Sequence, residues 1–212
     1  MTPTVVRTPR TAEDFALGVE LARMQAKAIS PVEVVRVLRA AGVRYVLVGA
    51  HAANGYTGKP RATVDVDVIV EFPKKAADAV AAAFPTLTME DHPVVVRFKR
   101  GDMDGIDLMK PIGSPLWPRL LKDNRQIDIE GESVTIPTVE GVLAAKFAAM
   151  MSLNRGQADK SIDGGDFIRM VQANPKIDLT RIAEFAELVF AGGGAFILKL
   201  VEDGRAGRRL EF

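Results

Sequence analysis

The sequence of 212 residues contains no cysteine, and aromatic residues make up only 6% of the chain. The absence of cysteine excludes disulfides, thiolate nucleophiles and cysteine-based zinc sites, and it fits a reducing compartment. An excess of one charge is also missing, because 28 Lys and Arg residues balance 27 Asp and Glu residues, for a net charge of +1. No overall basic field therefore indicates a nucleic-acid partner, and such a partner would need a local basic patch.

Long hydrophobic runs are absent as well. Apolar stretches such as 46–53 are far shorter than the roughly 20 residues that cross a membrane. The first ten residues carry charges and two prolines but no apolar segment typical of a secretory signal. These features predict a soluble, cytoplasmic protein without a membrane partner.

What is present is the composition of an ordinary globular protein, with 48% hydrophobic and 26% charged residues. We predict a single domain over 1–212, in which an α/β core at 30–137 is followed by a helical C-terminal subdomain at 138–212. Neither part is large enough to bury a good core alone. The expected fold class is α/β (α+β), with a mixed sheet flanked by helices.

Local sequence signals predict the order of the elements. N-capping and acidic first-turn residues indicate helices that begin at Thr11 and Ser30 and end near 28 and 42. Alternating or apolar runs and glycine turns predict the strands, and helical periodicity dominates after 137. The predicted strands are 45–48, 63–72, 94–99, 106–109, 126–129 and 133–136. The other predicted helices are 50–56, 74–84, 138–151, 161–173, 178–190 and a short last helix after 194.

The most informative segment is the predicted strand at 63–72, where Thr63, Asp65 and Asp67 share one face. Side chains two residues apart on a strand are about 7 Å apart at their bases. Two carboxylates at that spacing suit Mg²⁺, which takes oxygen ligands and neutralises their repulsion. Asp is also a poor strand former, so two Asp residues on one strand indicate that the site needs their carboxylates. The alternative interpretation is a solvated strand face, which is the usual meaning of an isolated acidic pair.

A third acid and a glycine turn complete the pattern. Asp107 lies in a strand-like segment with flanking residues that should face the core, whereas Asp102 and Asp104 fall in a predicted turn. We therefore favour Asp107 as the third carboxylate. Gly49, ahead of a short helix, offers backbone N–H groups and a positive helix end to a phosphate.

These residues resemble the nucleotidyltransferase superfamily, which has the polymerase-beta-like fold. Its signature is a strand, a glycine turn, a short helix, an Asp-x-Asp strand and a later carboxylate. The segments 49–52 and 58–63 resemble the bacterial AbiEii-like toxins of toxin–antitoxin systems, whose helical C-terminal part carries a lysine and a basic–acidic cluster. Residues that match this cluster are Lys146, Arg155, Lys160, Asp163 and Asp166. The resemblance covers residues 44 to about 170.

The resemblance implies a site with defined roles. Asp65, Asp67 and Asp107 would be the catalytic and metal-binding residues, with Asp107 as base or third ligand. The nucleotide would be bound by Gly49, Ala50, Arg61, Thr63, Lys146 and Asp163. The implied cofactor is Mg²⁺, two ions, or alternatively Mn²⁺. Ala50 stands where relatives have Gly or Ser, so a hydroxyl contact to phosphate is lost while the backbone N–H remains.

The implied reaction moves a nucleoside monophosphate from an NTP to an acceptor hydroxyl and releases pyrophosphate. The acceptor is either RNA, such as tRNA, with a cognate antitoxin as a protein partner, or a small-molecule hydroxyl. The alternative is a protein that is not an enzyme: a catalytically silent nucleotidyltransferase-fold domain that serves as a binding or regulatory module.

Other residues have interpretations that the sequence leaves open. Arg61 is either a phosphate clamp or a surface charge, and Lys146 either reaches solvent or meets an anion. His51 is expected to be a hydrogen-bonded structural residue, and Trp117 is expected to be core.

Overall fold

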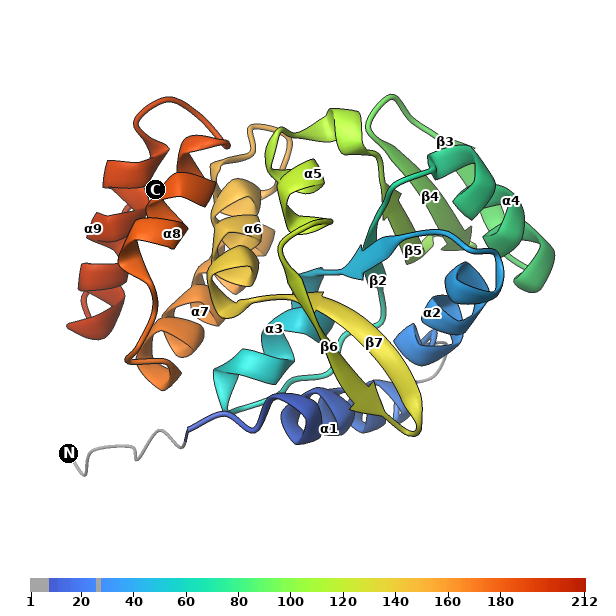
Figure 1. Ribbon diagram of the computed structural model, residues 1–212, viewed down its shortest axis with the longest axis horizontal. Helices are drawn as coiled ribbons and strands as arrows, with labels where there is room; N and C mark the ends of the chain where they lie inside the picture. The colour runs from blue at the N-terminus through green and yellow to red at the C-terminus, as the bar shows by residue number, and fades with distance from the viewer. Residues whose placement is uncertain (1–7, 26–27) are drawn as a thin grey trace.

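The computed structural model describes residues 8–25 and 28–212. It has a mixed α/β fold, in which helices surround a five-stranded sheet and a two-stranded ribbon lies beside it (Figure 1). The fold class expected from the sequence is confirmed. In the described part of the chain, no helix is both long and apolar enough to span a membrane.

The sheet brings the predicted acids together. Its strands are β1 (Tyr45–Leu47), β2 (Val66–Val70), β5 (Met103–Met109), β4 (Val95–Arg100) and β3 (Thr88–Asp91), in that spatial order. β2 and β5 are parallel, and the other neighbouring strands are antiparallel. Asp67 pairs with Asp107 across the parallel β2–β5 contact. Residues directly paired in neighbouring strands point to the same face, so these two carboxylates project side by side.

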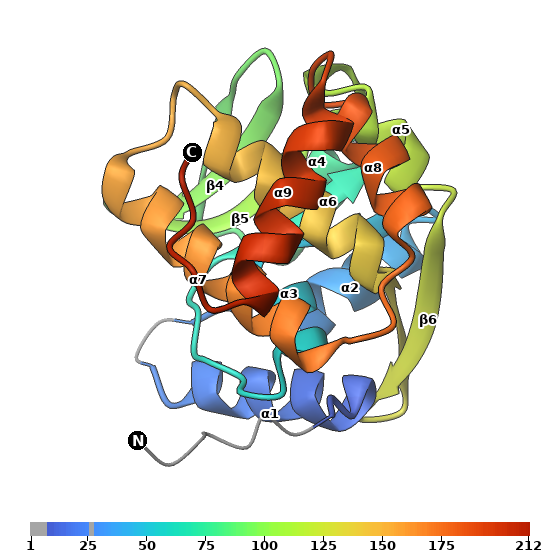
Figure 2. The same cartoon turned by 90° about the vertical axis from the view of Figure 1, so that its left-hand side faces the viewer.

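The helices fall into two groups. The first group accompanies the sheet and consists of α1 (Thr11–Arg23), α2 (Pro31–Ala40), α3 (Gly49–Thr57), α4 (Pro73–Ala83) and α5 (Leu116–Leu120), the last preceded by a 3₁₀ turn at Pro111–Gly113. The ribbon of β6 (Asn124–Ile129) and β7 (Glu132–Pro137) then leads to α6 (Val139–Met151), α7 (Gln157–Ala173), α8 (Leu179–Glu187) and α9 (Gly193–Arg205). Figure 2 shows this C-terminal helical layer face-on.

One hydrophobic cluster runs through both groups. It contains Phe15 of α1, Val68 of β2, Phe147 of α6 and Leu200 of α9, each at most 1% exposed. A smaller cluster lies between β1, β2, α5, α6 and α8. Burial of large apolar side chains in both clusters fixes the helical layer against the sheet, and the space that remains between them forms the cleft described below.

Several element boundaries differ from the predictions. β2 begins at Val66, so Asp65 lies just before the strand rather than inside it. β3 and α5 were not predicted, because β3 is largely exposed and α5 is only five residues long with an internal proline. α1 ends at Arg23, well before the predicted end, and residues 26–27 lie outside the described part. The last helix is longer than expected, at 13 residues.

His51 on α3 is buried without polar partners. Its ring centroid lies 6.2 Å from that of Phe15, and neither ring nitrogen has a hydrogen-bond partner in the described structure. The expectation of a hydrogen-bonded histidine was therefore wrong. Burial lowers the pKa of His51 to about 4, because the charged ring cannot be solvated there.

A pH-dependent stability follows from His51. The folded state keeps the ring neutral down to about pH 4, whereas the unfolded chain binds a proton below about pH 6.5. The free energy of unfolding should therefore lose up to about 3 kcal/mol from this residue as the pH falls between these values. Urea titrations should show this slope in the difference between wild type and His51→Leu. A flat difference between wild type and His51→Leu over this pH range would contradict the account.

Candidate functional site

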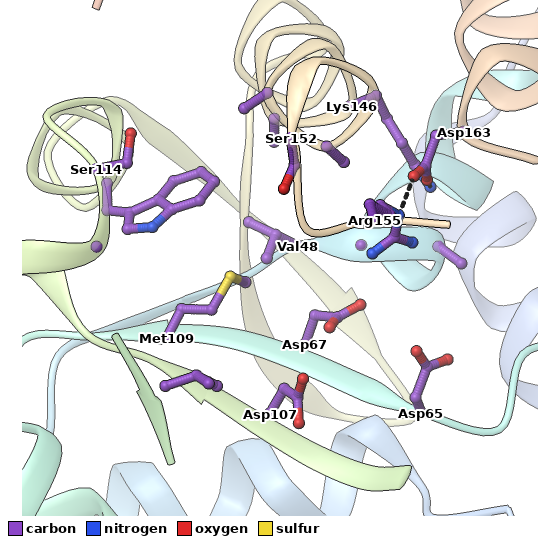
Figure 3. Close-up of a pocket in the computed structure, with 18 of the residues that line it drawn as sticks. Val48, Asp65, Asp67, Asp107, Met109, Ser114, Lys146, Ser152, Arg155 and Asp163 are labelled. Carbon is purple, nitrogen blue, oxygen red and sulfur yellow. Dashed lines mark hydrogen bonds and ion pairs between the residues drawn. The ribbon is translucent and has the colours of Figure 1, made fainter. Parts of the chain in front are cut away.

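A cleft of about 520 Å³ opens between the sheet and the C-terminal helices. Its lining includes residues from the end of β1, from β2, β4 and β5, and from α5, α6 and α7. Among the residues predicted from the sequence, it brings together Gly49, Ala50, Arg61, Thr63, Asp65, Asp67, Asp107, Lys146 and Asp163. In Figure 3 the carboxylates of Asp65, Asp67 and Asp107 lie in the lower half of the view, and Lys146 and Arg155 lie above them. The sequence therefore anticipated the lining of the acidic and basic parts of this cleft.

Gly49 lets the start of α3 approach Asp67. Its φ is +64°, and a Cβ atom placed there would lie 1.9 Å from Oδ2 of Asp67. Any larger residue would combine a strained backbone with a direct clash. The glycine therefore keeps Asp67 beside the N-terminal end of a helix, which attracts negative charge.

Asp67 is the electrostatic centre of the acids. The pKa of Asp67 is raised to about 7, first because burial disfavours the charged form and also because Asp65 and Asp107 place negative charges nearby. Carboxylates arranged in this way repel one another until a cation neutralises them. The three side chains offer only oxygen ligands, which is the ligand type that Mg²⁺ and Mn²⁺ prefer.

Asp65 is oriented by Thr63. The Thr63 hydroxyl donates a hydrogen bond to Oδ1 of Asp65. This bond fixes the carboxylate at the point where the chain enters β2. The nucleotide contact expected of Thr63 stays a prediction, and its observed role is to position an acid.

Asp107 is held by a residue that the sequence analysis missed. Arg97 of β4 pairs with Asp107 in the sheet, and its Nε and Nη2 donate to the two carboxylate oxygens at 2.8 and 2.6 Å. In the part of the chain that the structure describes, no three acidic or histidine side chains surround one point closely enough to hold an ion. With Arg97 in place, both carboxylate oxygens of Asp107 are already hydrogen-bonded, whereas Asp65 and Asp67 have no arginine partner among the hydrogen bonds of the described residues. Alternation along the strand at 94–99 could have identified Arg97 as facing the same side as the acids.

A buried charge network forms the basic side of the cleft. Lys146, which is 5% exposed, donates to Asp163 at 2.8 Å and to Asp166 at 2.9 Å. Arg155 lies 2.7 Å from the other oxygen of Asp163 (Figure 3). Lys146 thus meets anions rather than reaching solvent, which settles the alternative left open by the sequence. Lys160 lies on the same helix as both acids but contributes no contact to this network as the structure describes it.

Asp166 is the hub that links Arg61 to this network. Both oxygens of Asp166 accept hydrogen bonds from Arg61, at 3.1 and 2.9 Å, and Arg169 donates to one of them at 2.6 Å. Burial alone would raise the pKa of Asp166, but Arg61 and Lys146 bring it well below its ordinary value. Arg61 is therefore no loose surface charge. Three arginines and one lysine around two carboxylates leave an excess of positive charge beside the acids.

The backbone of Arg61 is held from the opposite side by Asn54. The buried Asn54 amide donates to the Arg61 carbonyl at 2.9 Å and accepts from its N–H at 3.0 Å. Gly18 of α1 makes room for this amide, because a Cβ atom there would lie 2.2 Å from its nitrogen. Packing of α1 on α3 thus helps to fix the loop that carries Arg61, a contribution that the sequence analysis did not foresee.

Comparison with solved structures returns proteins of low sequence identity and low structural similarity. An antigenic nucleotidyltransferase-like protein from Paracoccidioides brasiliensis is 14% identical, with 92% of this chain and 95% of that chain covered and a TM-score of 0.49. The antibiotic-resistance factor ANT(2'')-Ia is 11% identical, with 84% and 97% covered and a TM-score of 0.49. A tRNA-processing enzyme is 15% identical, with 81% and 57% covered and a TM-score of 0.36.

No family model matches the sequence, and no curated protein matches it. At these identities and scores the structural likenesses do not assign an activity. The function proposed below therefore depends on the geometry of the site.

Removal of Arg97 should strengthen divalent-ion binding. In Arg97→Gln, Asp107 loses its ion pair and becomes available to a metal. We expect Mn²⁺ affinity measured by calorimetry to rise by about tenfold, since a hydrogen bond to a charged group is worth about 1.5–3 kcal/mol. Lys99→Gln, on the same strand but paired with Glu90, is the matched control and should bind Mn²⁺ as wild type does. Unchanged or weaker binding in Arg97→Gln would show that Arg97 does not compete for this carboxylate.

Removal of Lys146 should destabilise the protein strongly. Lys146→Met leaves Asp163 and Asp166 buried with one cation fewer, and breaking a buried ion pair typically costs about 3–5 kcal/mol. The comparison is Lys160→Met, which removes a lysine outside the network and should change the free energy of unfolding by no more than about 0.5 kcal/mol. Urea unfolding measures both variants. Equal stabilities would mean that the Lys146 network does not contribute to folding.

Proposed function

We propose that the chain is a metal-dependent nucleotidyltransferase that moves a nucleoside monophosphate from an NTP to an acceptor hydroxyl. The observation that carries this proposal is the meeting of three carboxylates with the basic groups Arg61, Lys146 and Arg155 in one cleft. Acids alone would repel a triphosphate, and basic groups alone would only bind it. The two together suit a reaction in which a metal-bound phosphate chain is held beside a base.

The acids have separable roles in this proposal. Asp65 and Asp67 would hold Mg²⁺ or Mn²⁺, which supplies charge neutralisation at the reacting phosphate when bound. Asp107, level with Asp67 in the sheet, would accept the proton of the attacking hydroxyl or act as a third ligand once Arg97 releases it. A second ion, as expected from the sequence, would need this release. Gly49 keeps Asp67 close to the start of α3, so the metal position and the helix end serve the same phosphate.

The basic groups would receive the rest of the triphosphate. Arg61, Lys146 and Arg155 lie along one side of the cleft, and Gly49 and Ala50 contribute backbone N–H groups at the start of α3. Arg155 keeps 44% of its side chain exposed and can turn towards a phosphate while Lys146 stays with Asp163. Guanidinium groups pair with phosphate oxygens in two-pronged geometry, which favours Arg155 as a direct contact, whereas Arg61 would first have to release Asp166.

The acceptor in this proposal is RNA, such as tRNA, and a cognate antitoxin would be a protein partner. Positive side chains outside the acidic centre support an RNA acceptor, because they can contact its phosphates. They come from α5, β6 and the α6–α7 region and include Arg119, Lys122, Arg125 and Arg155. The alternative acceptor is a small-molecule hydroxyl.

The test of the function is incorporation of label from each α-³²P NTP into total tRNA, with and without Mg²⁺. We expect label that requires Mg²⁺ and falls at least about a thousandfold in Asp67→Asn, since the carboxylate holds the charge that the transition state needs. Asp102→Asn is the matched control, because Asp102 is exposed at the β4–β5 turn, and should keep wild-type incorporation.

Three outcomes separate the possibilities. Equal labelling by wild type and Asp67→Asn would contradict the mechanism. NTP binding in calorimetry without labelled tRNA would indicate another acceptor. Absence of both labelling and NTP binding would favour the catalytically silent module.

A further inference from the structure

The cleft has a second end that the proposed chemistry does not use. Partly buried residues packed against the smaller hydrophobic cluster, together with Val94, form an apolar part of the cleft lining. We call this lining the apolar end, and it consists of Val94, Met109, Trp117, Ala145, Ala148 and Val189. Trp117 was expected to be core, but it is only partly buried and faces this space. An aromatic side chain that stays partly open to a cleft is a common feature of ligand sites.

The strands order the cleft from the basic side to the apolar end. Asp65 precedes Asp67 by two residues on the side of Thr63 and Arg61. Met109 follows Asp107 by two residues on β5, so it shares the face of Asp107 and lies one step further along. Figure 3 shows Met109 and Ser114 to the left of the three acids, and Lys146 and Arg155 above and to the right of Asp67 and Asp107. Asp107 is thus the acid on the strand that leads to the apolar end.

In-line geometry then assigns the two ends, and this step rests on the proposed function. In phosphoryl-group transfer the attacking and leaving oxygens lie on opposite sides of the phosphorus atom. Pyrophosphate that leaves towards Arg61, Lys146 and Arg155 requires the attacking hydroxyl to arrive from the apolar end. The hydroxyl oxygen forms its bond to the α-phosphorus as the bond to the pyrophosphate oxygen breaks. Its proton goes to Asp107.

The lining of the apolar end limits what can enter. The acidic side chains of the cleft are Asp65, Asp67, Asp107 and Asp163, and none belongs to this end in the described structure. A polycationic acceptor would meet only Asp107 at the border of this end, and Arg97 already pairs with that carboxylate, so desolvating the acceptor's charges would be costly. The nearby hydroxyls of Ser114 and Ser152 each accept a backbone N–H bond and can still donate to an acceptor atom on a ligand.

We propose that the apolar end is the acceptor site and that Trp117 is the platform on which a flat, uncharged ring of the acceptor stacks. A nucleobase beside a ribose hydroxyl has this chemistry, because its face is apolar and its edges accept hydrogen bonds. Stacking of a base on an aromatic side chain changes affinity by about tenfold or more. Trp117 would thereby determine specificity for nucleoside acceptors over charged amino sugars.

Trp117 is the single tryptophan of the chain, so its fluorescence reports this site directly. Adenosine and cytidine should quench it, with the same dissociation constant in the absence and presence of saturating Mg²⁺–tripolyphosphate. Calorimetry should show at least tenfold weaker nucleoside binding by Trp117→Ala, partial recovery in Trp117→Phe, and unchanged binding of tripolyphosphate. Ile112→Ala, which changes a side chain 83% exposed on the neighbouring turn, is the control and should bind nucleosides as wild type does.

Other results would overturn the inference. Nucleoside binding that is lost when a non-hydrolysable NTP is added, but kept with tripolyphosphate, would mean that the apolar end holds the base of the NTP. Binding of a polycationic aminoglycoside there instead of nucleosides would refute the ring chemistry. Failure of Mg²⁺–tripolyphosphate to bind at all would refute the proposed function, and with it this inference, even if nucleosides quench Trp117.

Discussion

Asp67 and Asp107 lie opposite each other where β2 and β5 pair in parallel, and Asp65 stands at the entry to β2. Their repulsion, strengthened by burial of Asp67, is the constraint to which the surrounding structure responds. Arg97 offsets one carboxylate, Thr63 hydrogen-bonds another, and Gly49 places a helix end against the third. Each of these contacts lowers the cost of keeping the three acids close to one another in the folded protein.

The same principle explains how the helical layer is joined to the sheet side of the cleft. Lys146 of α6 and Asp163 and Asp166 of α7 would be unfavourable in the interior separately, but together they form paired, hydrogen-bonded charges. Arg61 connects this network to the loop that precedes β2. A change in the charge of this network is therefore expected to alter both the free energy of unfolding and the position of the groups proposed to bind phosphate.

The sequence was informative where local pattern and chemistry coincide. Alternation placed Asp67 on the correct face, and a glycine before a short helix anticipated the position of Gly49. Asp107 was identified because apolar residues flank it. The sequence did not predict contacts in which a site residue is held by a residue from a distant part of the chain. Arg97 meets Asp107 only through a strand pairing, and Asn54 holds Arg61 only because Gly18 of another helix leaves space.

The misjudged residues show the same limit. His51 was expected to have a hydrogen-bond partner, and the packing of α1 over α3 removed it from polar groups. Trp117 was expected to be core because it is large and apolar, yet the short helix α5 leaves one side of it towards the cleft. Burial of a single side chain depends on tertiary packing, which periodicity does not contain.

The most direct test of the central claim is calorimetric binding of a non-hydrolysable NTP analogue, with and without Mg²⁺, to wild type and to Asp67→Asn. The account predicts that wild type binds the analogue tightly only with Mg²⁺, because the acids otherwise repel the triphosphate. It also predicts that Asp67→Asn loses most of this metal dependence. Equal binding by wild type in the presence and absence of Mg²⁺ would contradict the claim that these carboxylates form a metal-dependent nucleotide site.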